Sequence, residues 1–206
     1  MGRKTVGIVV FDDIEVLDFC GPFEVFSVTR LNEEKRREEP SPFEVKLVSE
    51  RGGTITTSGG MRVTSDYSFA DCPKLDILCV PGGWGTRREI SNQTMLEWLR
   101  KRAAEAELLT AVCTGSMLLG FAGLLDSRRA TTHWRSLDWM AESFPKTTVL
   151  RDQHVVDDGT LITSAGISAG IDMALRVVTR YFGEGISRAT ARQMEYPYPE
   201  SNERRV

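Results

Sequence analysis

The sequence LLTAVCTGSMLLG, residues 108–120, decides the fold of this chain. An apolar, β-compatible run ends abruptly at Cys113, small residues follow, and apolar residues then recur at helical spacing through Met117, Leu118 and Phe121. This order predicts a strand, a tight turn and a helix. The residue at such a turn stands above the edge of a parallel sheet, as the nucleophile does in a Gly-x-Ser-x-Gly elbow. Here that residue is a cysteine.

The predicted position of Cys113 indicates a reactive thiol. The following helix would direct its free N–H groups and the positive end of its dipole at the turn. A thiol placed there has a lowered pKa, so more of it is thiolate, which is the attacking species. Free cysteines are also common as small buried hydrophobes, and that alternative stays open. The Thr-Gly-Ser helix start after a buried strand favours the nucleophile.

The segments on either side alternate between strand and helix patterns. Buried or alternating runs predict strands at residues 5–11, 43–49, 75–80 and 161–164, with a hairpin over 54–65 that turns at Gly59-Gly60. Helical spacing predicts helices from Pro22 onward and over residues 93–106, 166–182 and 184–194. Such alternation predicts an α/β fold in which helices flank a parallel sheet with right-handed crossovers. We expect a single domain over residues 1–206.

Composition and charge exclude several classes of protein. The chain of 206 residues is 41% hydrophobic and 27% charged, with a net charge of -3 and no basic stripe, so a nucleic-acid partner is not expected. No apolar run approaches the roughly 20 residues that span a bilayer, and no signal peptide is evident. The 4 cysteines form no Cys-x-x-Cys pair and there are only 2 histidines, which predicts no metal site, no cofactor, no disulfide framework and a cytoplasmic location.

Three polar or glycine-rich segments follow predicted strands. Asp18 lies beyond the first strand and just ahead of the helix expected from Pro22, Gly82-Gly83 follows the middle strand, and Cys113 ends the next. In open α/β sheets the ligand site lies at the carboxyl ends of the strands. The glycines of PGGWG, residues 81–85, allow the backbone to approach a ligand closely. We therefore expect these segments to meet in one site.

These residues also carry a family likeness that covers almost the whole chain. The set of motifs in order is LDFCGP (17–22), PGG (81–83), VCTGS (112–116), RRATTHW (128–134) and GISAGID (166–172). It resembles the ThiJ/PfpI superfamily, with its flavodoxin-like, class I glutamine amidotransferase-like fold, and within it the isonitrile hydratases. The same motifs are similar to the amidase-like domains of AraC-type regulators, whose helix-turn-helix domain follows the α/β domain. Since the chain ends at Val206, DNA binding is disfavoured.

Departures from related enzymes narrow the resemblance. Protease-like members have a histidine directly after the cysteine, where this chain has Thr114. Neither His133 nor His154 is followed two residues later by the glutamate of an amidotransferase triad. These departures therefore argue against peptidase and glutaminase activities. Cys20 stands where the hydratases tend to have threonine, which predicts differences in the pocket.

The resemblance implies hydration of a small-molecule isocyanide to an N-substituted formamide, by a homodimer. In this scheme Cys113 attacks the terminal carbon to give a thioimidate, while Asp18 acts as general acid and then as general base on water. Asp18, in an apolar pocket beside the thiol, is expected to have a raised pKa and to be hydrogen-bonded to Cys113. The N–H groups of Gly83, next to Gly82, and of Thr114 are candidates to stabilise negative charge. Ile167, on the loop that begins at Gly166, is expected to line the pocket.

Two alternatives remain from other functional classes. One is a different cysteine chemistry, such as glyoxal hydration or oxidation sensing by Cys113. The other is a ligand-sensing domain without catalysis, related to the AraC-type regulators. His133 is expected to be structural or pocket-lining, and we do not expect it to act as a base.

Overall fold

Seven strands form the central sheet of the computed structural model, which describes residues 2–205. Their order is β10-β11-β7-β6-β1-β2-β5. The strands are β1 (Lys4–Val9), β2 (Phe43–Ser49), β5 (Tyr67–Ser68), β6 (Ile77–Val80), β7 (Leu108–Val112), β10 (Val155–Asp157) and β11 (Leu161–Ser164). All neighbouring pairs are parallel except β10 with β11. The predicted α/β fold with a mainly parallel sheet is confirmed.

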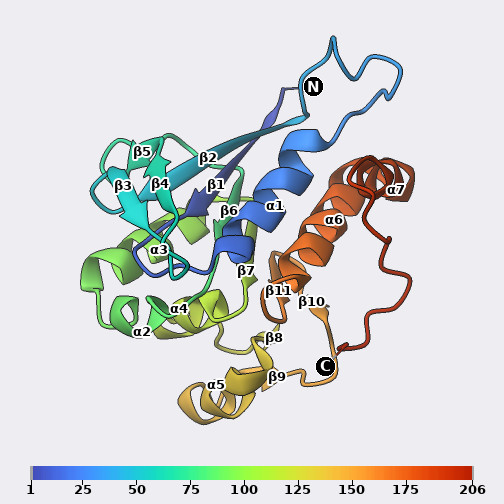
Figure 1. The fold of residues 1–206 in the computed structure, drawn as a ribbon. Coiled ribbons are helices and arrows are strands. Elements are labelled where there is room, and N and C mark those ends of the chain that lie inside the picture. Colours follow the sequence, from blue (N-terminus) through green and yellow to red (C-terminus); the bar gives the residue numbers. More distant parts are fainter. Residues whose placement is uncertain (1, 206) are drawn as a thin grey trace.

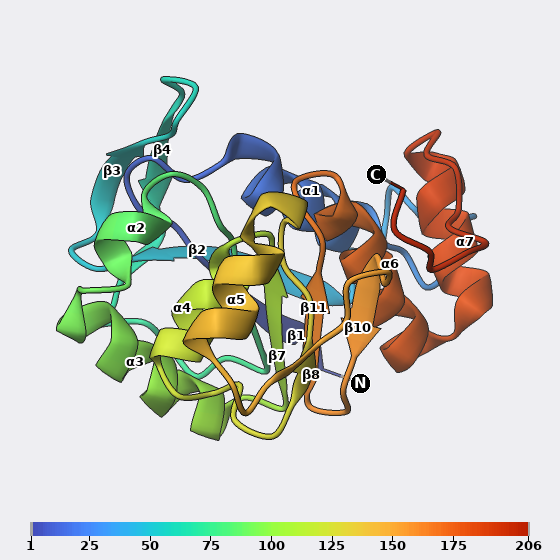
Figure 2. The ribbon, with the colours of Figure 1, turned by 90° about the horizontal axis from the view of Figure 1, so that it is seen from below.

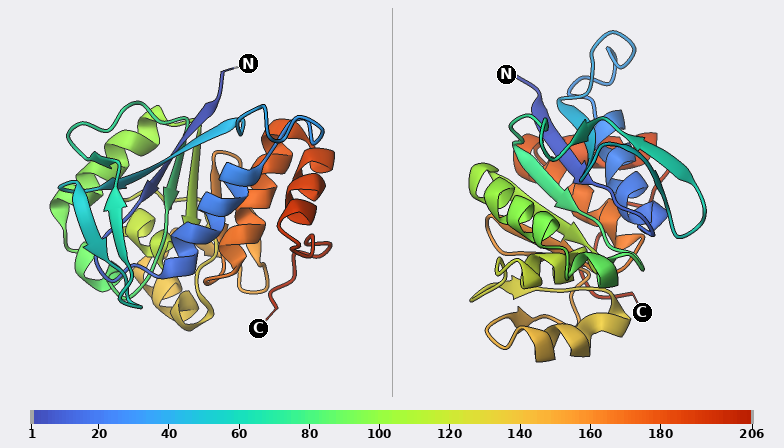
Figure 3. Two further views of the ribbon diagram at one scale, coloured as in Figure 1. Left: turned by 45° about the horizontal axis from the view of Figure 1, so that its top comes forward. Right: turned by 90° about the vertical axis from the view of Figure 1, so that its left-hand side faces the viewer.

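Helices cover both faces of this sheet (Figures 1 and 3). One face carries α1 (Val16–Val28), α6 (Ala169–Phe182) and α7 (Glu184–Gln193), and the other carries α3 (Gln93–Glu105) and α4 (Gly115–Phe121). The short helix α2 (Thr86–Glu89) contacts α4, and so does α5 (Leu137–Ser143), which continues the turn η1 (Trp134–Ser136). Figure 2 shows α5 lying across the carboxyl edge of the sheet.

The central strands are apolar because both of their faces are covered. Every residue of β6 and of β7 is buried, which is the pattern expected of parallel strands packed between two helix layers. Cys79 belongs to this core, and burial raises the pKa of its thiol to about 12. Phe26 of α1 packs on Phe43 of β2 with ring centroids 4.9 Å apart, which joins one helix layer to the sheet.

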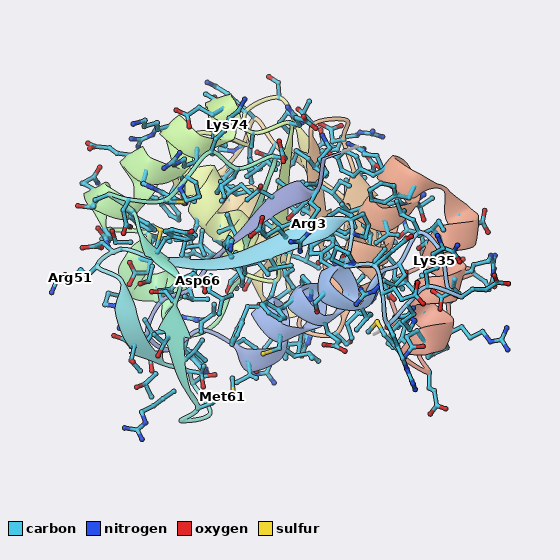
Figure 4. All side chains as sticks on the ribbon, turned by 90° about the horizontal axis from the view of Figure 1, so that it is seen from above. Arg3, Lys35, Arg51, Met61, Asp66 and Lys74 are labelled. Atoms are coloured by element: carbon cyan, nitrogen blue, oxygen red, sulfur yellow. The ribbon has the colours of Figure 1, made fainter. Side chains whose placement is uncertain are left out.

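Two small strand pairs lie outside the central sheet. The predicted hairpin is present as β3 (Gly53–Thr56) and β4 (Arg62–Ser65), paired antiparallel. Its tip, marked by Met61, projects away from the sheet in Figure 4. The second pair is parallel and joins β8 (Arg129–Ala130), which precedes α5 in the chain, to β9 (Thr148–Val149), which follows it.

The start of α1 differs from the sequence-based expectation. The helix begins at Val16, six residues before the predicted start, so Pro22 lies inside it. A proline inside a helix removes a hydrogen bond and costs about 3 kcal/mol. Close packing on α6 offsets this cost: a Cβ on Gly21 would lie 3.0 Å from Ile171, and one on Gly170 would lie 3.4 Å from Pro22. As a result Asp18 lies in the first turn of α1 rather than ahead of it.

The part of the chain from residue 2 to residue 205 lacks three kinds of feature. No helix in it combines the length and the apolar composition needed to cross a bilayer. No three of its His, Cys, Asp and Glu side chains gather closely enough to hold a metal ion. Its four cysteines, Cys20, Cys72, Cys79 and Cys113, are all free thiols.

Candidate active site

Cys113 occupies the predicted elbow. It follows the last residue of β7 and precedes α4, and its φ of 56° lies in the left-handed region. A non-glycine residue rarely adopts this conformation, which costs roughly 1–2 kcal/mol. The N–H of Cys113 donates to the carbonyl oxygens of Ser164 and Ala165, which hold the turn against the end of β11. The side chain is only 6% exposed, and it lies at the bottom of a cavity of about 330 Å³.

Asp18 lies beneath Cys113, fully buried at 0% exposure. Its Oδ2 accepts a hydrogen bond of 2.9 Å from the N–H of Gly82. The Cys113 thiol and the N–H of Ile167 lie near enough to lower the pKa of this carboxyl, whereas its Oδ1 is buried without a hydrogen-bond partner. Burial outweighs these interactions and raises the pKa of the Asp18 carboxyl from 3.8 to about 7. The pKa of Asp18 is therefore raised, as predicted, and about half of the carboxyl is protonated near pH 7.

The pKa of Cys113 is shifted in the direction opposite to the one predicted. Burial raises the pKa of the thiol, and the charge of Asp18 raises it further. Hydrogen bonds from the N–H groups of Thr114 and Ile167 lower the pKa by less. The helix that follows, α4, has only 7 residues, so its N-terminus does not compensate for the loss of water. Cys113 and Asp18 therefore act as a coupled pair, in which a proton rests on sulfur when the carboxyl is ionised.

Thr114 and the Gly82-Gly83 loop are held together by hydrogen bonds. The N–H of Gly83 donates to Thr114 Oγ1 at 3.0 Å, and the hydroxyl of Thr86 lies 3.0 Å from the same atom. A Cβ on Gly82 would lie 2.6 Å from the Thr114 nitrogen, so only glycine fits there. The Gly83 N–H thus has Thr114 Oγ1 as its partner in this structure, and its role in stabilising negative charge stays a prediction. The Thr114 N–H lowers the pKa of the Cys113 thiol.

Ile167 contributes its backbone as well as its side chain. It lies between β11 and α6 with a φ of 53°, an outlier for a β-branched residue. Strained backbone of this kind persists where the surrounding structure holds it, and it clusters at functional sites. The N–H of Ile167 lowers the pKa of both Cys113 and Asp18, while Ile167, 38% exposed, lines the cavity. The preceding Gly166 lies against the His133 ring.

His133 and Cys20 have different places relative to the cavity. His133 lines it, and Nδ1 of its ring accepts a hydrogen bond of 3.3 Å from the Arg135 N–H. Burial and the charges of Arg135 and Arg204 lower the pKa of His133, so the imidazole is neutral at pH 7. Cys20, on α1, is half-buried and lies outside the cavity lining.

Sequence reasoning missed a chain of contacts from the C-terminal segment to the elbow. The Arg204 guanidinium donates to Thr131 Oγ1 at 2.6 Å and to the Thr132 carbonyl at 3.1 Å. The Thr132 hydroxyl in turn donates to the Cys113 carbonyl at 2.9 Å. Arg204 lies more than 90 positions from Cys113 in the chain, and no local pattern indicates such a contact.

The mouth of the cavity is the second feature that the sequence did not indicate. Its exposed lining residues, here called the rim, come from two separate segments: Trp84 and Arg87 from one, and Trp134 and Arg135 from the other. Trp84 is 66% exposed and Trp134 is 50% exposed. Below this rim, Cys113 and Thr114 form the floor of the cavity, and Asp18 lies buried behind Cys113, a pair that we describe together as the floor.

Comparison with known proteins identifies the family. The profile of the DJ-1/PfpI family matches residues 4–180. Isonitrile hydratase of Pseudomonas putida is 36% identical over 193 residues, which cover 93% of this chain and 78% of that protein. The HTH-type transcriptional regulator CdhR of Pseudomonas aeruginosa is 36% identical over 147 residues, which cover 71% of this chain but only 43% of the regulator. A crystal structure of a ThiJ/PfpI family protein from Pseudomonas syringae superposes with a TM-score of 0.83 at 29% identity, covering 98% of this chain and 79% of that one. The chain belongs to the DJ-1/PfpI family.

Proposed function

We propose that this protein hydrates isocyanides to N-substituted formamides. The observation that carries the proposal is the contact between the Cys113 thiol, at the bottom of a cavity, and a buried Asp18 carboxyl whose pKa is about 7. Such a pair supplies a sulfur nucleophile together with a group that gives and takes protons near neutral pH. The similarity to isonitrile hydratase supports the same chemistry.

The first step joins the sulfur to the substrate. The terminal carbon of an isocyanide, R–NC, can accept both a proton and a nucleophile. A bond forms between Cys113 Sγ and this carbon, and the proton lost by the thiol reaches the same carbon through the Asp18 carboxyl. The product is a neutral thioimidate, R–N=CH–S-Cys113. The N–H groups of Thr114 and Ile167, which serve the sulfur, stabilise negative charge on it as the proton leaves.

The second step releases the product. Asp18 accepts a proton from a water molecule as the water oxygen bonds to the thioimidate carbon, and Asp18 passes this proton to the substrate nitrogen, which gives R–NH–CH(OH)–S-Cys113. The C–S bond then breaks, which leaves R–NH–CHO and returns the proton to the thiol. Atoms balance, since one water is added to each isocyanide. The neutral His133, whose Nδ1 is already an acceptor for the Arg135 N–H, has no part in these proton transfers.

Formation of a formamide tests this proposal. Purified protein is incubated with cyclohexyl isocyanide or benzyl isocyanide, and the N-substituted formamide is measured by proton NMR. We expect turnover by the wild type and a loss of at least ~10³-fold in Cys113→Ala, because the nucleophile is removed. Cys20→Ala is the matched control, since Cys20 is also a free thiol but does not line the cavity.

Two outcomes would contradict the proposal. Absence of formamide with the wild-type protein excludes the activity. Retention of activity in Cys113→Ala excludes the covalent mechanism.

A second candidate function is ligand sensing without catalysis, which the similarity to CdhR favours. The same cavity would then bind a small molecule and no bond would form with Cys113. Saturable binding that is equal in the wild type and in Cys113→Ala, with no turnover, would support this function against the first. Isothermal titration calorimetry with the formamide and the isocyanide measures it.

A further inference from the structure

The rim of the cavity combines two exposed tryptophans with two arginines. The guanidinium carbon of Arg87 lies 4.2 Å from the centre of the Trp84 ring, and that of Arg135 lies 4.8 Å from the centre of the Trp134 ring. Both distances are within the range of cation–π interaction, in which the ring holds the guanidinium over its face. All four side chains line the cavity that ends at Cys113. The two pairs thus present flat apolar surfaces and positive charge at the same opening.

These two arginines lack the acidic partners that their neighbours have. Arg88, next to Arg87 on α2, forms ion pairs with Asp13 at 3.3 Å and with Glu89 at 3.0 Å. Within residues 2–205, neither Arg87 nor Arg135 has a carboxylate within ion-pair distance. A guanidinium offers a planar fork of N–H donors that matches a carboxylate. Both arginines therefore keep this capacity for a ligand.

Among the described residues of the cavity lining, Glu15 carries negative charge, and Arg87 and Arg135 carry positive charge. The charge of Glu15 acts on both Asp18 and His133. Arg87 and Arg135 lie at the rim, each over one of the two exposed tryptophan rings. An anionic substrate would be drawn in with its negative end outward, which leaves its other end against Cys113.

We propose, in an inference that rests on the proposed function, that the substrate is a small anionic isocyanide. Its isocyano group would lie at Cys113, its flat apolar body would contact Trp84 and Trp134, and a carboxylate would bind Arg87 and Arg135. The cavity, at about 330 Å³, is near the lower end of the usual range for small-molecule pockets, which suits a body the size of one ring.

A matched pair of substrates tests this assignment. 4-Isocyanobenzoate and 4-isocyanobenzamide have the same shape and differ in charge. We expect kcat/KM of the wild type to be at least about tenfold higher for the benzoate, because charge-assisted hydrogen bonds are about twice as strong as neutral ones. In the double variant Arg87→Gln/Arg135→Gln this ratio should fall toward one. Arg88→Gln, which removes an arginine already paired with acids, should leave the ratio as it is.

A binding measurement separates this inference from the proposed activity. The corresponding formamides, 4-formamidobenzoate and 4-formamidobenzamide, are titrated into Cys113→Ala by calorimetry. Tighter binding of the benzoate, lost in the double arginine variant and increased in Glu15→Gln, supports the anion site even if no isocyanide is turned over. Hydration of both isocyanides with equal kcat/KM, or equal binding of both formamides, overturns the inference and leaves the proposed function standing.

Discussion

The floor and the rim of the cavity differ in nearly every physical respect. On the floor, Asp18 is excluded from water and Cys113 almost so, and the Gly82 N–H holds one oxygen of the Asp18 carboxyl in place. On the rim, Trp84 and Trp134 are largely exposed, and the guanidinium groups of Arg87 and Arg135 lie over these rings without a carboxylate partner among residues 2–205. A buried, preorganised floor fixes which bond is made, whereas an open rim selects which molecule arrives. Changes to the floor should therefore affect all substrates alike, and changes to the rim should separate one substrate from another.

Replacement of Asp18 by asparagine should have the largest effect, because it removes the group that moves the proton. We expect formamide production by Asp18→Asn to fall by about 10²–10⁴-fold, and by the same factor for charged and neutral isocyanides. Asp13→Asn is the control, because Asp13 is an exposed acid that lies five positions before Asp18 in the chain. A loss of less than tenfold, or one that depends on substrate charge, would show that floor and rim are not separate.

The same variant should stabilise the fold at alkaline pH. Between pH 3.8 and about 7 the folded chain keeps a proton on Asp18 that the unfolded chain has lost, so stability of the wild type falls across that window. Above it, ionisation of this buried carboxyl costs the fold on the order of 4 kcal/mol.

Urea denaturation measures this effect. The advantage of Asp18→Asn in free energy of unfolding should grow by roughly 2–3 kcal/mol between pH 5 and pH 8. An advantage that stays constant over this range would mean that Asp18 titrates normally, contrary to its burial.

Ile167 joins the two regions, since its N–H belongs to the floor and its side chain to the cavity wall. Ile167→Asn should raise the free energy of unfolding by about 1 kcal/mol, because asparagine tolerates the left-handed backbone better than a β-branched residue. Ile167→Val keeps the strain and should bring no gain. Thermal unfolding compares the three proteins. Destabilisation by asparagine would show that side-chain packing, and not the backbone, sets the conformation of this loop.

The floor was largely predictable from the sequence and the rim was not. A buried run that ends at Cys113 before a helical pattern is a local signal. The motif around Asp18 is one of those that carry the resemblance to the family. Both residues were therefore expected at one sheet edge, where the structure places them. Trp84 and Trp134 lie in quoted motifs, yet no periodicity indicates that two separate loops bring them to one opening.

The wrong predictions share one physical cause, which is that tertiary contacts outweigh local signals. The helix around Pro22 begins early because α6 packs closely against it. The pKa of Cys113 is raised because burial exceeds the effect of a helix of 7 residues. The homodimer and the cytoplasmic location stay predictions.

The central claim is that Cys113 and Asp18 share a proton, and the pH dependence of thiol alkylation tests it most directly. Iodoacetamide labelling of Cys113, followed by mass spectrometry from pH 5 to pH 10, reports the reactivity of the sulfur without any substrate. The wild type should show a step centred near pH 7, where the carboxyl becomes able to accept the thiol proton. Asp18→Asn should lack this step and react only toward alkaline pH, because burial alone keeps the thiol pKa above its ordinary 9.0. Identical profiles in the two proteins would contradict the account.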